Sequence, residues 1–279
     1  MTSPVTIAIP FFAMLIALEV FLALSKEENY DRKDTWTNIA LGLGSVLFGS
    51  VLGSILVVSY EFLYQFAPYK ISMNTVGAWI ALMLTDDFCY YWFHRFSHEV
   101  RFLWNFHVVH HSSNYFNLSV AVRQSWFGNI ANWIFYIPIA LMGFPLWAFT
   151  TMHGLNLIYQ FWIHTKYIKK LPAWFEFVFN TPSHHRVHHA VNEIYLDKNY
   201  GGIFIIWDRI FGTFTEESEE PRYGILKPIY SYNWLWINTH AWFEMLEAMK
   251  ERKTLKGKLR CIFGRPAMDF DEMIQPQIG

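Results

Sequence analysis

The chain has little charge and almost no cysteine. Only 16% of its 279 residues are Asp, Glu, Lys or Arg, compared with about 25% in ordinary soluble domains. This composition excludes a disordered chain and argues against a water-soluble globule. The formal net charge of −1 gives no excess of basic residues, so we expect no nucleic-acid partner. Cys89 and Cys261 are too few for a disulfide framework or a cysteine-based zinc module.

Long hydrophobic stretches take the place of charge. Hydrophobic residues make up 53% of the chain and aromatic residues 19%. Residues 5–24 carry no charge except Glu19, and their length suits one membrane-spanning helix of about 20 residues. A signal peptide is the alternative, but it requires a basic start and a small-residue cleavage site. Residues 1–4 contain no Lys or Arg and residues 24–26 form a poor cleavage site, so we predict a retained span.

Three further apolar stretches follow. Residues 38–60 contain no charged residue and predict a second span, and residues 71–85 predict a third, which ends at two aspartates. Residues 124–165 also lack Asp, Glu, Lys and Arg, and a single helix over them would be roughly twice as long as a bilayer core is thick. Residues 142–145, Met-Gly-Phe-Pro, interrupt that stretch. We therefore predict a helical hairpin, with a buried helix pair of a soluble protein as the alternative.

Basic residues predict how these stretches are oriented. The loop between the first and second spans has three basic residues, whereas the loop between the second and third has only Lys70. Because basic loops stay in the cytoplasm, we expect the first loop and the chain after Asp87 on the cytoplasmic side. The hairpin returns to that side, where the basic segment 166–170 follows it. We therefore predict a multi-pass membrane protein whose active site faces the cytoplasm.

The C-terminal tail leaves two interpretations open. Residues 250–265 are rich in Lys and Arg, and residues 233–249 before them contain three tryptophans. Tryptophan beside basic residues suits a helix at the membrane surface. A solvated amphipathic helix packed on the rest of the chain fits the pattern equally well.

Most of the twelve histidines fall in a few short motifs. His94 and His98 form an H-x-x-x-H pair, and residues 107–111 and 185–189 each form an H-x-x-H-H triplet. Because residues three and four apart lie on one face of a helix, each motif is expected to bring its imidazoles to one point. Together they offer eight nitrogens, which is more than one zinc or iron ion accepts. We therefore expect two metal ions.

Three other histidines are predicted differently. His153, in the middle of the hairpin, is expected to be a hydrogen-bonded helix residue, and His240 is expected to lie in the tail helix away from the site. The role of His184 stays open, because it neighbours His185 and consecutive residues on a helix point about 100° apart.

The donor set narrows the choice of metal. Imidazole binds Zn, Cu, Fe and Ni. A structural zinc site usually contains cysteine, and a hydrolytic zinc site needs an open position and a carboxylate base. Eight or nine histidines on two ions fit dioxygen chemistry better, with paired iron that removes hydrogen from an inert C–H bond. Zinc can also occupy such a site on purification.

The histidine motifs and their neighbours resemble the fatty acid hydroxylase superfamily, also called the sterol desaturase family. The similarity extends over about residues 86–214. The segments that carry it read DFCYYWFHRFSHE (87–99), HVVHHSS (107–113), NTPSHHRVHH (180–189), DKNYG (197–201) and WDRIFGTF (207–214).

Other segments are similar to one branch of that superfamily, the alkylglycerol monooxygenases. They read YFNLS (115–119), RQS (123–125) and YQFWIHT (159–165). The resemblance implies an integral-membrane di-iron monooxygenase that uses dioxygen and tetrahydrobiopterin to hydroxylate the ether-linked carbon of a membrane alkylglycerol. No motif identifies a pterin site or an electron donor. The alternatives are a sterol, carotenoid or fatty acyl hydroxylase or desaturase of the same superfamily, and a non-catalytic metal-binding membrane protein.

The resemblance also adds His164 to the ligand set. We expect Asp87 and Glu99 to orient imidazoles through their non-ligating N–H groups, and Asn199 and Asp208 to hold the closing turn. The expected metal ligands are His94, His98, His107, His110, His111, His164, His185, His188 and His189.

The predicted fold is an all-α integral-membrane helical bundle with a histidine-rich cytoplasmic cap that holds a dimetal centre. We divide it into membrane helices (1–75), a di-iron domain (76–215) and a basic amphipathic tail (216–279).

Overall fold

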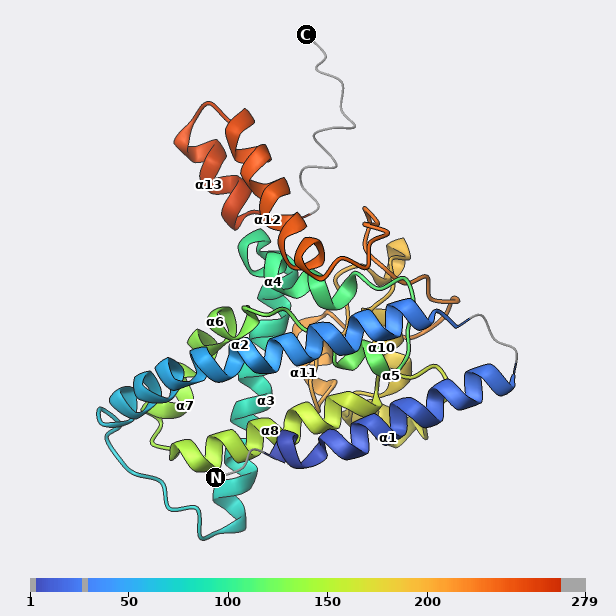
Figure 1. Cartoon of the computed structure of the whole chain (residues 1–279). Coiled ribbons are helices and arrows are strands. Elements are labelled where there is room, and N and C mark those ends of the chain that lie inside the picture. The colour runs from blue at the N-terminus through green and yellow to red at the C-terminus, as the bar shows by residue number, and fades with distance from the viewer. Residues whose placement is uncertain (1–3, 27–29, 267–279) are drawn as a thin grey trace.

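The computed structural model describes residues 4–26 and 30–266, and the regular secondary structure of this part of the chain is helical (Figure 1). Its β-type pairing consists of two isolated bridges, Phe179 with Phe204 and Ala190 with Tyr223, and it contains no strand. The all-α prediction is therefore confirmed for the described residues. The division at residues 75 and 215 stays a prediction.

Helix α1 (Pro4–Ser25) corresponds to the first predicted span. It is long and apolar enough to cross a membrane, and Glu19 is its one charged residue. Large apolar side chains face outward along it, with Ile7 63%, Phe11 61% and Met14 58% exposed. Its inner face packs along α8 (Leu146–Trp162) and α5 (Leu118–Ala121).

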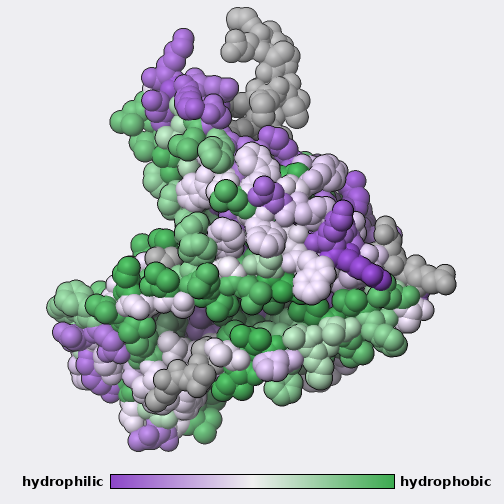
Figure 2. Space-filling model, viewed as in Figure 1, coloured by the Kyte–Doolittle hydropathy of each residue, from purple (hydrophilic) through white to green (hydrophobic). Residues whose placement is uncertain are grey.

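Helix α2 (Arg32–Tyr64) contains the second predicted span. Asp31 caps its start by accepting hydrogen bonds from Lys33 N and Asp34 N. The helix bends by 49° between Arg32–Val51 and Gly53–Tyr64, and it is a second candidate span only if both parts are counted together. Figure 2 shows a broad hydrophobic band over α1 and α2.

The third predicted span differs from the structure. Helix α3 (Val76–Glu99) starts five residues later than predicted, because Thr75 caps it by accepting a hydrogen bond from Ala78 N. It is not among the described helices that are apolar and long enough to cross a membrane. In Figure 1, α3 runs across α2 and α8 rather than alongside them. Its second half instead carries polar residues into the centre of the molecule.

The predicted hairpin is present, with an irregular first arm. This arm consists of α6 (Gly128–Asn132), a 3₁₀ turn η1 (Trp133–Tyr136) and α7 (Ile137–Leu141), and α8 forms the second arm. Gly143 makes the turn with a φ of 92°, and a Cβ atom there would lie 1.9 Å from the Tyr69 carbonyl oxygen. Lys26, just after α1, lies over the Tyr167 ring beyond α8, so both helices end on the same side of the molecule.

Short helices surround the site and bring its histidines together. They are α4 (Arg101–His111), α9 (Ala173–Val178), α10 (Pro182–His188), the 3₁₀ turn η2 (Glu193–Tyr195) and α11 (Ile206–Phe211).

The tail helices α12 (Trp234–Glu251) and α13 (Leu255–Phe263) project from the body beside α4 (Figure 1). Ile237 and Met245 are buried on the inner side of α12, whereas Phe243 and Leu255 are exposed. The tail therefore packs on the rest of the chain and leaves an apolar outer side with a hydrophilic tip (Figure 2). Its position at a membrane surface stays a prediction.

Candidate metal centre

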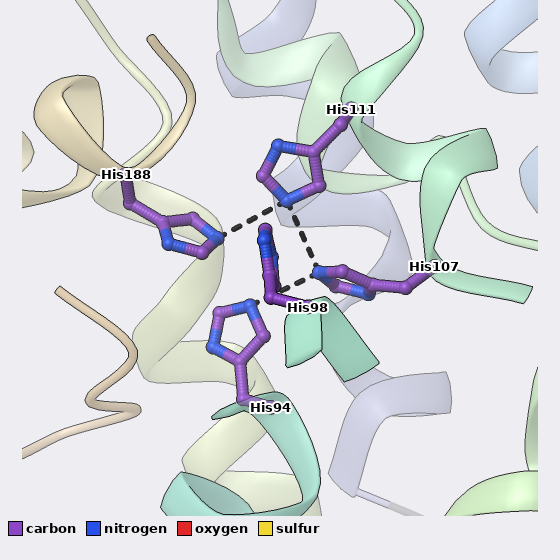
Figure 3. A group of neighbouring side chains, drawn as sticks. All are labelled: His94, His98, His107, His111 and His188. Atoms are coloured by element: carbon purple, nitrogen blue, oxygen red, sulfur yellow. Dashed lines mark hydrogen bonds between the residues drawn. The ribbon is translucent and has the colours of Figure 1, made fainter. Parts of the chain in front are cut away.

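The structure gathers all nine expected ligand histidines into two groups. Within each group, one nitrogen of every ring lies within 4.8 Å of the corresponding nitrogen of every other ring. The five-histidine group, shown in Figure 3, has its rings directed toward one another. Its members are His94, His98, His107, His111 and His188. The four-histidine group consists of His110, His164, His185 and His189.

This grouping corrects the expectation that each triplet serves one point. Each H-x-x-H-H triplet is divided between the groups: its first and last histidines enter one group, and its middle histidine enters the other. On α4, His107 and His111 face the five-histidine group and His110 faces the four-histidine group. The physical reason is that consecutive helix residues point about 100° apart. The two triplets therefore tie the two groups together.

Hydrogen bonds to backbone carbonyls fix which nitrogen of several rings carries the proton. His94 Nδ1 lies 2.8 Å from the Tyr200 carbonyl oxygen, and His188 Nδ1 lies 3.0 Å from that of Lys198. His164 Nδ1 lies 2.7 Å from the Gln160 carbonyl oxygen. Because a carbonyl only accepts, each Nδ1 donates, and the neutral ring keeps a lone pair on Nε2.

These lone pairs face one another. His110 Nδ1 donates to the Arg123 carbonyl oxygen at 3.2 Å, so His110 also has its lone pair on Nε2. Yet the Nε2 atoms of His110 and His164 are 3.2 Å apart, with no proton to share between them. A cation between the rings turns this repulsion into ligation. The donor set therefore fits a metal ion in each group.

The spacing of the nitrogens supports the same conclusion. In the five-histidine group, successive Nε2 atoms are 3.0, 3.1 and 3.1 Å apart, and in the four-histidine group they are 3.2, 2.8 and 3.1 Å apart. Ligands about 2.1 Å from an ion are about 3.0 Å apart at right angles and about 3.4 Å apart in a tetrahedron. The observed separations lie close to these values, as expected for rings that would share one ion. His98 Nε2 is buried without a hydrogen-bond partner, as expected for a nitrogen reserved for a metal.

Burial keeps the rings neutral. It lowers the pKa of His110 to about 4, against the opposing effect of the hydrogen bond to the Arg123 carbonyl. Burial and the neighbouring His98 ring hold the pKa of His94 well below its usual value. The pKa of His188 is lowered in the same way by burial and by His94. At neutral pH these rings present lone pairs, which metal binding requires.

Asp87 and Glu99 do not orient imidazoles as expected. Asp87 is fully buried and accepts hydrogen bonds from Ile203 N at 2.6 Å, Phe204 N at 3.0 Å and Trp207 Nε1 at 2.9 Å. It anchors the segment after residue 201 to α3. Glu99 accepts from Arg95 at 3.1 Å. Asp87 lies seven residues before His94 and therefore on the same face of α3, but two helical turns separate their side chains.

Backbone carbonyls in residues 197–201 orient the imidazoles of His94 and His188 instead. Asp208 holds this segment by accepting from Tyr200 N and Gly201 N, each at 2.7 Å. Asn199, at φ 56°, donates to the Thr215 carbonyl oxygen at 2.7 Å. The expectation that Asn199 and Asp208 hold the closing turn is confirmed.

Asp197 is an acidic residue that faces one of the grouped rings, with Oδ1 3.8 Å from His98 Nδ1. Sequence analysis did not single it out, although it opens the DKNYG segment. The remaining histidines lie outside both groups. His153 contacts Asp86 at 3.1 Å, as expected for a hydrogen-bonded helix residue, and His240 contacts carbonyls of its own helix. His184 is buried beside Phe214.

Comparisons with known proteins place these residues in context. A family model described as Fatty acid hydroxylase matches residues 79–213. Alkylglycerol monooxygenase of Danio rerio is 40% identical over 263 residues, which cover 93% of this chain and 58% of the relative. The Homo sapiens protein of that name is 37% identical over 282 residues, covering 98% and 63%. The Xenopus tropicalis protein is 36% identical over 277 residues, covering 96% and 61%.

The chain thus spans 58–63% of the length of these three relatives. No solved structure matches it.

Proposed function

We propose, from the match of residues 79–213 to the fatty acid hydroxylase model, that the chain is a membrane-bound lipid monooxygenase of that family with two iron ions. The observation that carries the proposal is the pair of histidine groups whose Nε2 lone pairs converge. Five imidazoles would hold one ion and four would hold the other. Bound there, iron would supply the activation of dioxygen and the removal of hydrogen from a C–H bond.

The chain's own residues prepare this site. The carbonyls of Tyr200, Lys198, Gln160 and Arg123 hold the Nδ1 protons, so each ring presents Nε2 to the ion without rearrangement. The surrounding side chains bury all four rings of the four-histidine group. Exclusion of water protects reactive species from side reactions.

The proposed substrate is an alkylglycerol, the class of molecule for which the relatives are named. One oxygen atom of dioxygen enters a C–H bond beside the ether oxygen. The other leaves as water, with two electrons and two protons from a reductant, for which we propose tetrahydrobiopterin. The hemiacetal then breaks: the C–O bond opens, the hydroxyl proton moves to the ether oxygen, and an aldehyde and glycerol form.

An alkylglycerol stays in lipid, and the exposed surface of the chain suits that location. Val46, Leu47 and Val58 on α2 are exposed by 61–69%, so they add to the apolar faces of α1. Contiguous apolar surface of this kind marks contact with membrane or protein. We propose that these helices lie in the bilayer and that the histidine groups lie at its cytoplasmic side.

The test measures metal and product on the same sample. Protein purified without oxygen is assayed for iron per chain, and then for fatty aldehyde released from an alkylglycerol with dioxygen and tetrahydrobiopterin. We expect two irons and aldehyde that depends on all three reactants. If the protein binds iron and releases no aldehyde, but hydroxylates a sterol or fatty acyl lipid in a parallel panel, its substrate would be that of another branch of the superfamily. A protein that binds no iron and oxidises none of these lipids would refute the proposal.

A further inference from the structure

The carbonyls that orient rings in the two histidine groups come from different parts of the chain. In the five-histidine group, the rings of His94 and His188 are oriented by carbonyls of residues 198–200. In the four-histidine group, the carbonyls belong to Arg123 and Gln160. These latter residues are tied to the two apolar helices α1 and α2, each of which contributes a buried carboxylate.

Glu19 is the link from α1. Its side chain is 5% exposed although α1 is otherwise uncharged. Oε1 accepts from Thr165 Oγ1 at 2.5 Å, and Thr165 directly follows the ligand His164. Oε2 accepts from Leu118 N at 2.6 Å. Phe12 stacks on Phe161 at 4.0 Å one helical turn before His164, so α1 is fixed to this end of the hairpin.

Asp34 is the link from α2. Its side chain is buried, and Oδ2 accepts from Asn38 Nδ2 at 2.9 Å and from Ser113 Oγ at 2.8 Å. Asn38 Oδ1 in turn accepts from Arg123 Nη1 at 2.8 Å. Asp34 also lies 3.7 Å from that Nη1 atom.

Arg123 completes the link to His110 through both its backbone carbonyl and its side chain. Its carbonyl accepts from His110 Nδ1, and its fully buried side chain donates to the Val109 carbonyl at 2.7 Å and to Ser112 Oγ at 2.8 Å. The carbonyl therefore orients the His110 ring, and the guanidinium holds the last turn of α4, which also carries His111 of the five-histidine group. Gly42 lets α2 come this close, because a Cβ atom there would lie 2.5 Å from the Val122 carbonyl oxygen.

We propose that Glu19 and Asp34 are positioning residues chiefly for the four-histidine group, and that the apolar helices thereby act mainly on the affinity of one of the two ions. The inference rests on the proposed function, because it requires metal in both groups. Ionisable residues in apolar helices are costly to bury and are retained where they have a partner to hold. Here that partner is the backbone beside His110 and His164.

The test follows the loss of each ion separately. Full-length protein in lipid nanodiscs is loaded with ferrous iron without oxygen, and an excess of the chelator ferrozine reports iron release over time. The ion of the four-histidine group is identified as the release phase that His189→Ala removes. Glu19→Gln and Asp34→Asn each replace a carboxylate with an amide. An NH₂ group then stands where a carboxylate oxygen accepted a hydrogen bond. We expect that phase to accelerate by about 10-fold or more, and the other phase to change much less.

Glu61→Gln is the matched control, because Glu61 is an exposed carboxylate on the same helix as Asp34, and both phases should stay as in the wild type. Thr165→Val removes only the hydroxyl that Glu19 accepts from, and it replaces Glu19→Gln if that variant fails to fold. Unchanged release in the Glu19 or Thr165 variant and in Asp34→Asn would overturn the inference, and so would equal acceleration of both phases. A wild-type protein without iron would instead overturn the proposed function.

Discussion

The Nε2 atoms of His110 and His164 lie 3.2 Å apart while each ring donates its Nδ1 proton to a backbone carbonyl oxygen. Two neutral imidazoles in this arrangement direct lone pairs at each other. The hydrogen bonds that hold them there come from separate elements, α8 and the segment after α5. The fold therefore maintains a local repulsion that a bound cation removes.

Removal of the metal should for this reason destabilise the protein. A ligand that binds the native state stabilises it by mass action, and here it also neutralises the facing lone pairs. We expect chelator-treated protein to unfold at a lower temperature than the iron-loaded protein, with recovery when ferrous iron is restored. Thermal unfolding of the same sample before treatment, after treatment and after iron addition measures the effect. Equal unfolding temperatures in all three would contradict metal binding at these rings.

Ligand substitutions should act on metal and turnover together. His110→Ala leaves three imidazoles in its group, and we expect one iron per chain and a loss of turnover of more than about 100-fold, since even outer-shell changes cost 10–100-fold. His188→Ala leaves four imidazoles in the other group, so its iron should be lost less completely. Iron analysis and aldehyde release measure both effects.

His240→Ala is the control for these variants, because His240 is buried in α12 and contacts carbonyls of its own helix. Its iron content and turnover should match the wild type. Full iron content in His110→Ala would contradict the assignment of His110 as a ligand.

Local patterns in the sequence predicted much of the site. They did not predict the backbone contacts between distant parts of the chain. The histidine spacing predicted that the rings meet, because positions three and four apart share a helix face. It did not predict that the triplets divide, although the consecutive histidines at 110 and 111 already point about 100° apart. The carbonyl of Tyr200 lies 106 residues beyond His94, and a backbone oxygen has no signature in the sequence.

The fold shows the same division between local and long-range information. The hairpin turn at Gly143 was predicted because residues 142–145 cannot continue a helix. The start of α3 was predicted five residues too early, because apolar composition alone does not reveal the cap at Thr75. Asp87 was expected to orient an imidazole near the metals. It accepts hydrogen bonds from residues 203–207 and from Asn156, which only the folded chain brings near.

Asp87 and Glu99 should therefore differ sharply when each is neutralised. Asp87→Asn places an amide group among several donors, and a buried group left unsatisfied costs about 1–3 kcal/mol. We expect the unfolding temperature to fall by several degrees. Glu99→Gln weakens a partly exposed pair with Arg95, which is worth about 1 kcal/mol or less, so its unfolding temperature should stay close to that of the wild type. Thermal unfolding of both variants decides between the roles, and equal effects would contradict this assignment.

Acid should destabilise the metal-free protein through its buried rings. The pKa of His110 is about 4 in the folded chain because burial disfavours the charged ring, whereas an unfolded histidine titrates near 6.5. Between these values the unfolded chain binds a proton that the native chain does not, so stability falls as the pH decreases from about 6.5 toward 4. One ring contributes up to roughly 1.4 kcal/mol per pH unit.

His110→Asn removes that contribution, so the unfolding temperature of the metal-free variant should decline less steeply between pH 7 and pH 5 than that of the metal-free wild type. Iron-loaded protein should resist acid further, because the ion competes with protons for Nε2. Parallel slopes for the two metal-free proteins would contradict a buried neutral ring at position 110.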